Sequence, residues 1–197
     1  MKTILFSTLW TLFLLNSFIT VAQVDFKANT ETSVLNWKGF KPTSEHYGTV
    51  NVKNGFFTVK DAQIVSGEFE IDMTSIIDLD MDADSEYNAK LVNHLKNEDF
   101  FNVEKYPEAS FKVVKTEAKG DKTIMTGDLT IKGITHSVSF PASVKIDGNK
   151  LYVKSETFKI DRSKWNIKYK SKSFFSDLED NFIYNDIELS FTVTASQ

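Results

Sequence analysis

The sequence predicts an all-β, antiparallel domain of about eight strands with one short inserted helix. Three observations lead to this fold class. Apolar and polar residues alternate with period two over most of the chain, turn signals separate the alternating runs, and one stretch changes to helical spacing. A sheet whose strands each have one apolar face has to close on itself or pack against a second sheet.

The alternation is clearest over residues 63–72. Val65, Phe69 and Ile71 share one face there, and acidic residues share the other, as in a half-buried strand with a wet outer face. The pattern recurs often enough to account for the whole domain. Further runs cover 125–131, 138–147 and 187–194, with shorter versions at Leu35, Val50 and Phe111.

Short turn signals lie between these runs. Asn54-Gly55 and Asp147-Gly148-Asn149 are typical of tight hairpins, and Lys119-Gly120-Asp121 is a third candidate. No Pro-rich linker, low-complexity tract or repeat interrupts the chain. The sequence therefore predicts a single domain with short connections between neighbouring strands.

Residues 86–97 depart from the period of two. Leu91 and Leu95 lie four residues apart, with Tyr87 one turn earlier, which is the spacing of one helix face. We expect one helix here, inserted between two strands. Residues suited to cap its start and to end the excursion are Asp84, Ser85 and Pro107.

The first 22 residues predict a cleaved signal peptide. Lys2 precedes an uncharged stretch rich in Leu, Ile and Phe, and Thr20-Val21-Ala22 offers the small or β-branched residues that a signal peptidase reads. We expect cleavage before Gln23, and hence a periplasmic or secreted protein. The alternative is an uncleaved membrane anchor, which polar residues and the lack of a basic stop signal before Lys27 disfavour.

The composition of the expected mature domain, residues 23–197, excludes several classes of function. It has no Cys, and therefore no disulfide and no thiol chemistry. Without Lys2 it has 22 basic and 27 acidic residues, a formal net charge of −5. Nucleic acid is not expected as a partner, because phosphate binding needs clustered Lys and Arg. The sequence does not decide between a monomer and a homodimer.

Three longer strings carry a resemblance to a known family. They are HLKNEDFFNVEKYPEASF at 94–111, GDLTIKGITH at 127–136 and FKIDRSKWNI at 158–167. With 67–76 and 185–189 they span almost the whole mature chain, and they resemble the YceI-like family of polyisoprenoid-binding proteins. The resemblance implies an exported, eight-stranded, lipocalin-like β-barrel whose apolar interior binds a long isoprenoid chain. The acidic run 78–84 departs from the family pattern.

An apolar barrel interior suits such a ligand physically. A prenyl tail has no polar group to satisfy, and it gains roughly 0.8 kcal/mol for each carbon moved out of water. Shape and apolarity are therefore enough for binding, unless the same side chains simply fill a dry core. The residues that the sequence places on inner faces as cavity candidates are Trp37, Phe69, Phe111, Met125, Leu129, Phe140, Phe158 and Trp165.

No metal site is expected from the sequence. The histidines lack ligand spacing such as two His four residues apart on a helix. The acidic run 78–84 begins like a calcium loop, but Ala83 stands where the loop needs Gly and Ala89 where it needs Glu. A solvated loop that favours the helix N-terminus is the preferred interpretation. The three histidines are His46, His94 and His136.

Asp161-Arg162, within the third string, is the pair most open to a catalytic interpretation. Neighbouring residues of a strand point to opposite faces, so the two are not expected to pair directly. We expect a structural salt bridge or a polar contact near the barrel mouth. A contact between Arg162 and a quinone or pyrophosphate headgroup is a further hypothesis.

Three functions follow from the sequence. The first is an exported carrier of an isoprenoid lipid or quinone, with no cofactor and no stable membrane insertion. The second is a filled barrel that binds a partner protein or acts under stress. The third is an enzyme acting on a bound isoprenoid, which lacks support because no Cys, G-x-S-x-G or phosphate-loop motif is present.

The expected signal peptide gives a first test. Expression of the full chain in a bacterium should yield a periplasmic protein that begins at Gln23, because the small residues before it form the cleavage site. Intact-mass measurement of the fractionated protein checks this. A membrane-bound product that retains residues 1–22 would support the anchor alternative instead.

Overall fold

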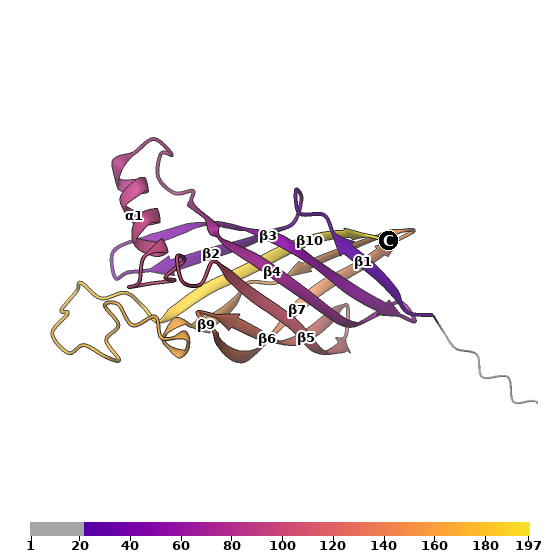
Figure 1. The fold of residues 1–197 in the computed structure, drawn as a ribbon. Coiled ribbons are helices and arrows are strands. Elements are labelled where there is room, and N and C mark those ends of the chain that lie inside the picture. The colour runs from indigo at the N-terminus through magenta and orange to yellow at the C-terminus, as the bar shows by residue number, and fades with distance from the viewer. Residues whose placement is uncertain (1–21) are drawn as a thin grey trace, which may run out of the picture.

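Strands make up most of the computed structural model, which describes residues 22–197 (Figure 1). The signal-peptide prediction lies almost entirely outside these residues. One α-helix, α1 (Glu86–Lys96), and one short 3₁₀ helix, η1 (Arg162–Trp165), interrupt the strands. The strands are β1 (Val24–Ala28), β2 (Val34–Phe40), β3 (Glu45–Lys60), β4 (Gln63–Asp78), β5 (Glu108–Lys119), β6 (Lys122–Ile131), β7 (Ile134–Asp147), β8 (Lys150–Ser155), β9 (Phe158–Asp161) and β10 (Asp186–Ser196).

The sheet closes because β10 pairs on both of its edges. Antiparallel pairing runs from β2 through β3, β4, β5, β6, β7 and β8, and β10 then pairs with both β8 and β2. This gives a ring of eight strands, which confirms the predicted barrel. Two short strands, β1 and β9, lengthen the barrel by continuing the positions of β2 and β8 in the ring. β1 pairs with β3 and β10 beyond the end of β2, and β9 pairs with β10 beyond the end of β8.

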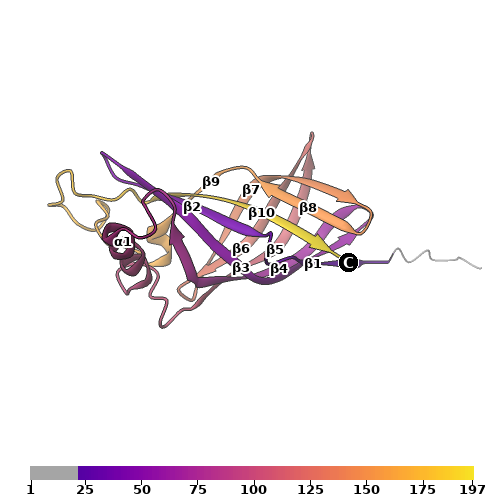
Figure 2. The same cartoon turned by 90° about the horizontal axis from the view of Figure 1, so that it is seen from above.

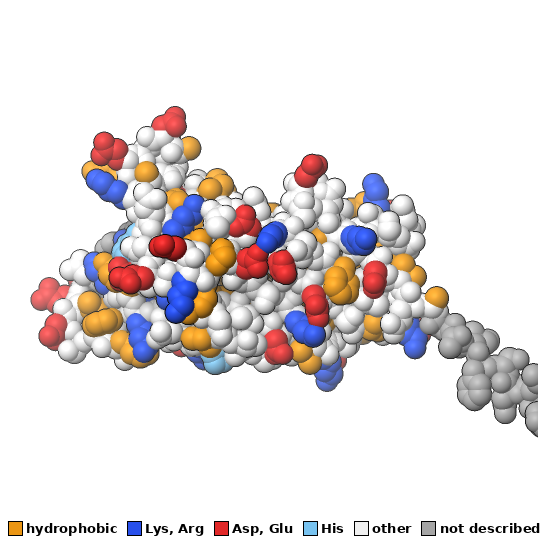
Figure 3. Space-filling model, viewed as in Figure 1, with side chains coloured by type: hydrophobic (Ala, Val, Ile, Leu, Met, Phe, Trp, Pro, Cys, Tyr) orange, Lys and Arg blue, Asp and Glu red, His pale blue; other side chains and the backbone are white. Residues whose placement is uncertain are grey.

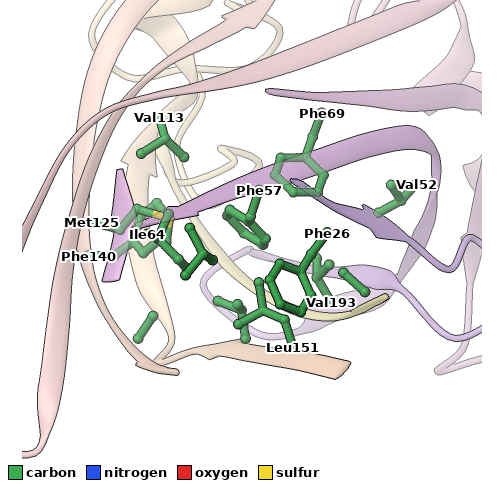
Figure 4. Packing of buried hydrophobic residues seen from close by; sticks show 14 residues of the cluster. Phe26, Val52, Phe57, Ile64, Phe69, Val113, Met125, Phe140, Leu151 and Val193 are labelled. Carbon is green, nitrogen blue, oxygen red and sulfur yellow. The ribbon is translucent and has the colours of Figure 1, made fainter. Parts of the chain in front are cut away.

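The two ends of the barrel differ. In Figures 1 and 2, α1 and the loop 166–185 lie at one end, and the C-terminus lies at the other. At the C-terminal end, buried side chains pack across the interior and close it, as Figure 4 shows for ten labelled residues. Phe26, Met125 and Leu151 are each at most 2% exposed there. The interior is therefore sealed at this end by apolar packing.

One predicted turn is wrong. Asn54-Gly55 lies inside β3, and the chain turns instead at Asp61-Ala62, where both residues have positive φ angles of 51° and 60°. A bulge at Lys53 separates the β3–β4 pairs on either side of Asn54-Gly55. Gly55 is needed because the Phe69 ring would lie only 2.2 Å from an added Cβ. The two other predicted turns join β7 to β8 and β5 to β6 as expected.

A second bulge corrects the predicted inner face of β4. The register shifts between Thr58 and Val59, which turns Ile64 inward and leaves Val65 41% exposed. Phe69 and Ile71 keep their predicted inward positions. A bulge inserts one residue into the alternation, so a strict period of two fails on one side of it.

The predicted helix is present, and its buried face differs from the prediction only at Tyr87. The Ser85 hydroxyl accepts a hydrogen bond from the Tyr87 backbone N–H and caps α1, as expected. Tyr87 itself is 73% exposed, whereas Asn88 and Leu95 are buried. Leu91 and Leu95 pack on the barrel as predicted, and Asn88 takes the place expected for Tyr87.

Glycines make room for aromatic rings inside the barrel. Gly55 and Gly67 pair across strands with Phe69 and Phe57, and Gly127 lies against the Phe111 ring. At Gly127 an added Cβ would lie 2.4 Å from the Phe111 ring and 2.5 Å from the Lys112 carbonyl oxygen. A phenylalanine can lie flat across such a position because no side chain occupies it.

Gly127→Ala should therefore lower the free energy of unfolding by about 2 kcal/mol, the cost of overpacking a rigid interior. Urea denaturation measures this. The matched control is Gly39→Ala, since an added Cβ meets no atom within 4 Å. Equal stability of the two variants would contradict the packing argument.

Candidate functional site

Two apolar chambers lie inside the barrel, one behind the other. The first, here called the mouth chamber, lies at the end covered by α1 and the loop 166–185. The second, the inner chamber, lies closer to the sealed end. Leu35, Ile71, Leu129 and Leu189 line both chambers and so lie between them. The interior thus holds two adjacent apolar spaces, separated only by these four aliphatic side chains.

Phenylalanines dominate the inner chamber. Its remaining lining residues are aliphatic, so no polar side chain faces this space. Phe140 stacks on Phe158, with ring centroids 4.3 Å apart and planes tilted by 21°, and meets Phe191 edge to face at 5.2 Å. Such contacts fix ring positions as well as supplying apolar area. The six aromatic residues are Phe57, Phe69, Phe111, Phe140, Phe158 and Phe191.

Both chambers are narrow. Their cavity volumes are about 90 Å³ for the mouth chamber and about 50 Å³ for the inner one. Pockets that hold drug-sized molecules usually measure about 300–1,000 Å³. Side chains therefore already fill most of the interior, and a long ligand has to displace some of them.

The mouth chamber is covered by two segments from outside the sheet. Leu95 of α1 and Phe100, just after that helix, are each 7% exposed and form one part of the cover. Ile183 and Tyr184 of the loop 166–185 form another part. His94 packs edge-on against Phe100 and Tyr169, with ring centroids 4.9 Å and 4.6 Å away, and joins the two segments.

Most of the predicted cavity residues meet at these chambers. Trp37 and Trp165 line the mouth chamber, and the Trp165 indole N–H donates to the Leu129 carbonyl oxygen at 3.2 Å. Leu129, Phe69, Phe111, Phe140 and Phe158 line the inner chamber. Met125 lines neither chamber and lies in the sealed core. Contact of any of them with a ligand stays a prediction.

Arg162 is the one charged residue that lines the mouth chamber, and it is only 1% exposed. Its guanidinium donates to the carbonyl oxygens of Ile167 (2.7 Å), Tyr169 (2.9 Å), Ile183 (3.1 Å) and Tyr184 (3.1 Å). These bonds hold both ends of the loop 166–185 against the barrel. The salt bridge expected of Arg162 is not among the ion pairs of residues 22–197.

Burial lowers the pKa of Arg162 to about 10, and the nearby Asp161 carboxylate opposes this shift. The side chain stays charged at neutral pH. Asp161 instead accepts from the Ser163 backbone N–H and hydroxyl, at 2.9 Å and 2.6 Å, and so caps η1. Arg162 therefore leaves a positive charge beside the mouth chamber, with at most one of its five N–H groups unused.

The solvated-loop interpretation of the acidic run is wrong for its first members. Asp78 is 4% exposed, and Asp80 is hydrogen bonded to His46, whereas Asp82 and Asp84 are exposed. The sequence analysis missed this cluster because His46 lies 32 residues before Asp78. The antiparallel pairing of β3 with β4 brings them together, and no local sequence pattern signals that register.

Burial raises the pKa of Asp78 to about 6, and the adjacent Asp80 carboxylate adds to the rise. The pKa of Asp80 is lowered in spite of its burial. The adjacent Asp78 carboxyl group and the hydrogen bonds from the Tyr47 backbone N–H and from His46 outweigh the desolvation of its carboxylate. The two carboxylates therefore interact directly and differ in how readily they ionise.

Comparison with known proteins identifies the family. The model of the YceI-like domain matches residues 23–195. The chain belongs to the YceI-like family.

No helix in residues 22–197 is long and apolar enough to cross a membrane.

Curated YceI-like relatives match part of the chain. A UPF0312 protein of Photorhabdus laumondii is 33% identical over 102 residues, 52% of this chain and 50% of its own length. Protein YceI of Escherichia coli O157:H7 is 30% identical over 99 residues, 50% of this chain and 48% of its own length. The chain thus spans about half the length of these relatives in the matched regions.

Solved structures share the barrel over most of its length. BcnA of Burkholderia cenocepacia has a TM-score of 0.65 at 21% identity, covering 86% of this chain and 99% of its own. A polyisoprenoid-binding domain from Saccharophagus degradans has a TM-score of 0.61 at 13% identity, covering 90% of this chain and 99% of its own. At these identities the likeness establishes the YceI-like fold alone.

Arg162→Lys should lower the free energy of unfolding by about 3 kcal/mol, because an ammonium cannot reach four carbonyl oxygens at once. Urea denaturation measures the loss. Lys159→Ala is the control, since its side chain is 59% exposed and should change stability by less than about 0.5 kcal/mol. Equal stability of the two variants would contradict the structural role of Arg162.

Proposed function

We propose that this YceI-like protein is an exported carrier that binds one long-chain isoprenoid lipid, a polyisoprenoid or an isoprenoid quinone. The observation that supports this most is the pair of adjacent apolar chambers inside the barrel. They are lined by aliphatic and aromatic side chains, with a single buried cation near the mouth. The polyisoprenoid-binding domain with the same fold supports the ligand class.

The tail would occupy both chambers as an extended chain. The small chambers leave room for one chain at most once the aliphatic side chains between them move, and burial would supply the driving force at roughly 0.8 kcal/mol per carbon. Moving the phenylalanines of the inner chamber and ordering the tail would offset part of this gain. Binding would thus favour slim, flexible chains over rigid molecules of equal volume.

The headgroup would lie at the mouth, near Arg162. Four backbone carbonyls already use most of the guanidinium donors, so a headgroup would receive at most one hydrogen bond from it. The uncompensated charge would still attract a phosphate or a polarised quinone oxygen. We therefore propose that Arg162 first positions the loop and only secondarily attracts the headgroup.

Binding, and not catalysis, is proposed because Arg162 is the one ionisable group other than Tyr184 that lines the mouth chamber, and none lines the inner one. General acid–base chemistry needs a group within hydrogen-bond reach of the reacting atom. The export signal predicted for residues 1–22 would suit a carrier that shields a tail from water between membranes.

A filled barrel that binds a partner protein is the second candidate. The small cavity volumes favour it, because a packed interior needs no ligand. It predicts that the protein takes up no prenyl lipid at all.

Tryptophan fluorescence separates the two. The mature chain has only Trp37 and Trp165, and both line the mouth chamber. Titration with a long-chain isoprenoid quinone should quench their emission saturably at one quinone per chain, whereas the same quinone without its tail should not. Weak, linear quenching by both compounds would favour the filled barrel.

Leu129→Phe tests whether the tail spans both chambers, because Leu129 lies between them. A long-chain quinone should bind at least about tenfold more weakly, since even two excluded carbons are worth this much. A quinone with a tail short enough for the mouth chamber should bind unchanged. The neighbouring Asp128→Asn is the control, and equal losses for both tail lengths would refute a tail that spans both chambers.

A further inference from the structure

Three side chains at the mouth end place metal-binding atoms close together. His46 lies near the start of β3, Asp78 is the last residue of β4, and Asp80 follows two residues later. One ligand atom from each lies within 4.8 Å of the others. The His46 Nδ1 is already 3.1 Å from the Asp80 Oδ2. Ligand atoms on one tetrahedral zinc ion are about 3.3 Å apart, so only small movements are needed.

The Asp78 carboxylate gives an independent reason to expect a ligand. Its Oδ2 accepts from the Met81 backbone N–H at 3.1 Å and from the Asn88 amide at 3.3 Å. Its Oδ1 is the one buried side-chain oxygen or nitrogen without a hydrogen-bond partner in residues 22–197. A buried carboxylate oxygen beside a second carboxylate is costly unless a cation or a proton satisfies it.

We propose that His46, Asp78 and Asp80 form a binding site for a divalent transition-metal ion of the Zn²⁺ class. One imidazole nitrogen and two carboxylate oxygens are ligands that suit this class, and they leave a fourth position for water. Ca²⁺ and Mg²⁺ prefer sites made of oxygen atoms alone. The metal would replace the proton that now joins His46 and Asp80.

The site would fasten α1 to the barrel. The Asn88 side chain of α1 donates to the Asp78 carboxylate and to the Met81 carbonyl oxygen, at 3.3 Å and 3.2 Å. A metal held by Asp78 would thus fix the acceptor that α1 uses. The end of β4 that carries Asp78 is also joined to the mouth chamber. The indole N–H of Trp37, which lines that chamber, donates to the Ile77 carbonyl oxygen at 3.2 Å.

The test uses mature protein purified without a histidine tag and stripped with EDTA. Equimolar Zn²⁺ should bind at one ion per chain by native mass spectrometry. A modest excess should raise the melting temperature by about 5 °C and slow amide exchange in α1. Ca²⁺ and Mg²⁺ should have no effect at the same concentration.

The diagnostic variants keep the buried Asp78 in place. His46→Gln and Asp80→Asn should both abolish the Zn²⁺-dependent shift. His94→Gln is the matched control, because His94 also pairs with an aspartate, Asp99, at 3.1 Å, but is not part of the three-residue cluster. It should keep the full Zn²⁺-dependent rise of the melting temperature.

No rise in the unaltered protein would mean that a shared proton satisfies the carboxylates. An equal rise in His46→Gln would place the metal elsewhere. Either result would overturn the proposal.

Discussion

The rest of the structure depends on β10 forming hydrogen bonds along both of its edges. This strand pairs with β2 on one side and with β8 and β9 on the other, so the sheet has no seam at that position. Closure removes exposed strand edges and creates an inside that must be filled with apolar groups. With eight strands, that inside is just wide enough for side chains or for one slim ligand. The choice between a packed core and a binding path is therefore made by side chains and not by the fold.

The two ends of the barrel are closed in different ways. Aliphatic and aromatic residues seal the C-terminal end, whereas the other end is covered by α1 and the loop 166–185, which are not part of the sheet (Figure 2). The side of the molecule drawn in Figure 3 does not suggest a charged docking face. Figure 3 shows acidic and basic side chains interspersed over the visible side. Both covers combine apolar packing with polar contacts, which are made at Arg162 for the loop and at Asp78 for the helix.

The sequence predicted those features that depend on neighbouring residues along the chain. Alternation placed Leu129 and Phe140 on inner faces, and the Ser85 cap located the helix. Sequence patterns gave wrong predictions where contacts between residues far apart in the chain determine the local structure. Asn54-Gly55 has the composition of a turn, but the Phe69 ring of β4 needs that glycine inside a strand. Val65 alternates correctly in sequence, and a bulge turns it outward. The histidine–aspartate cluster depends on the register of β3 against β4, which no local pattern encodes.

The central claim is that the interior binds an isoprenoid chain. Native mass spectrometry of the mature protein, purified from a bacterial periplasm and followed by solvent extraction, tests it most directly. The account predicts a co-purified species of isoprenoid mass at close to one per chain. An empty protein that also takes up no added polyprenyl lipid would contradict the account and leave a filled barrel with the same fold.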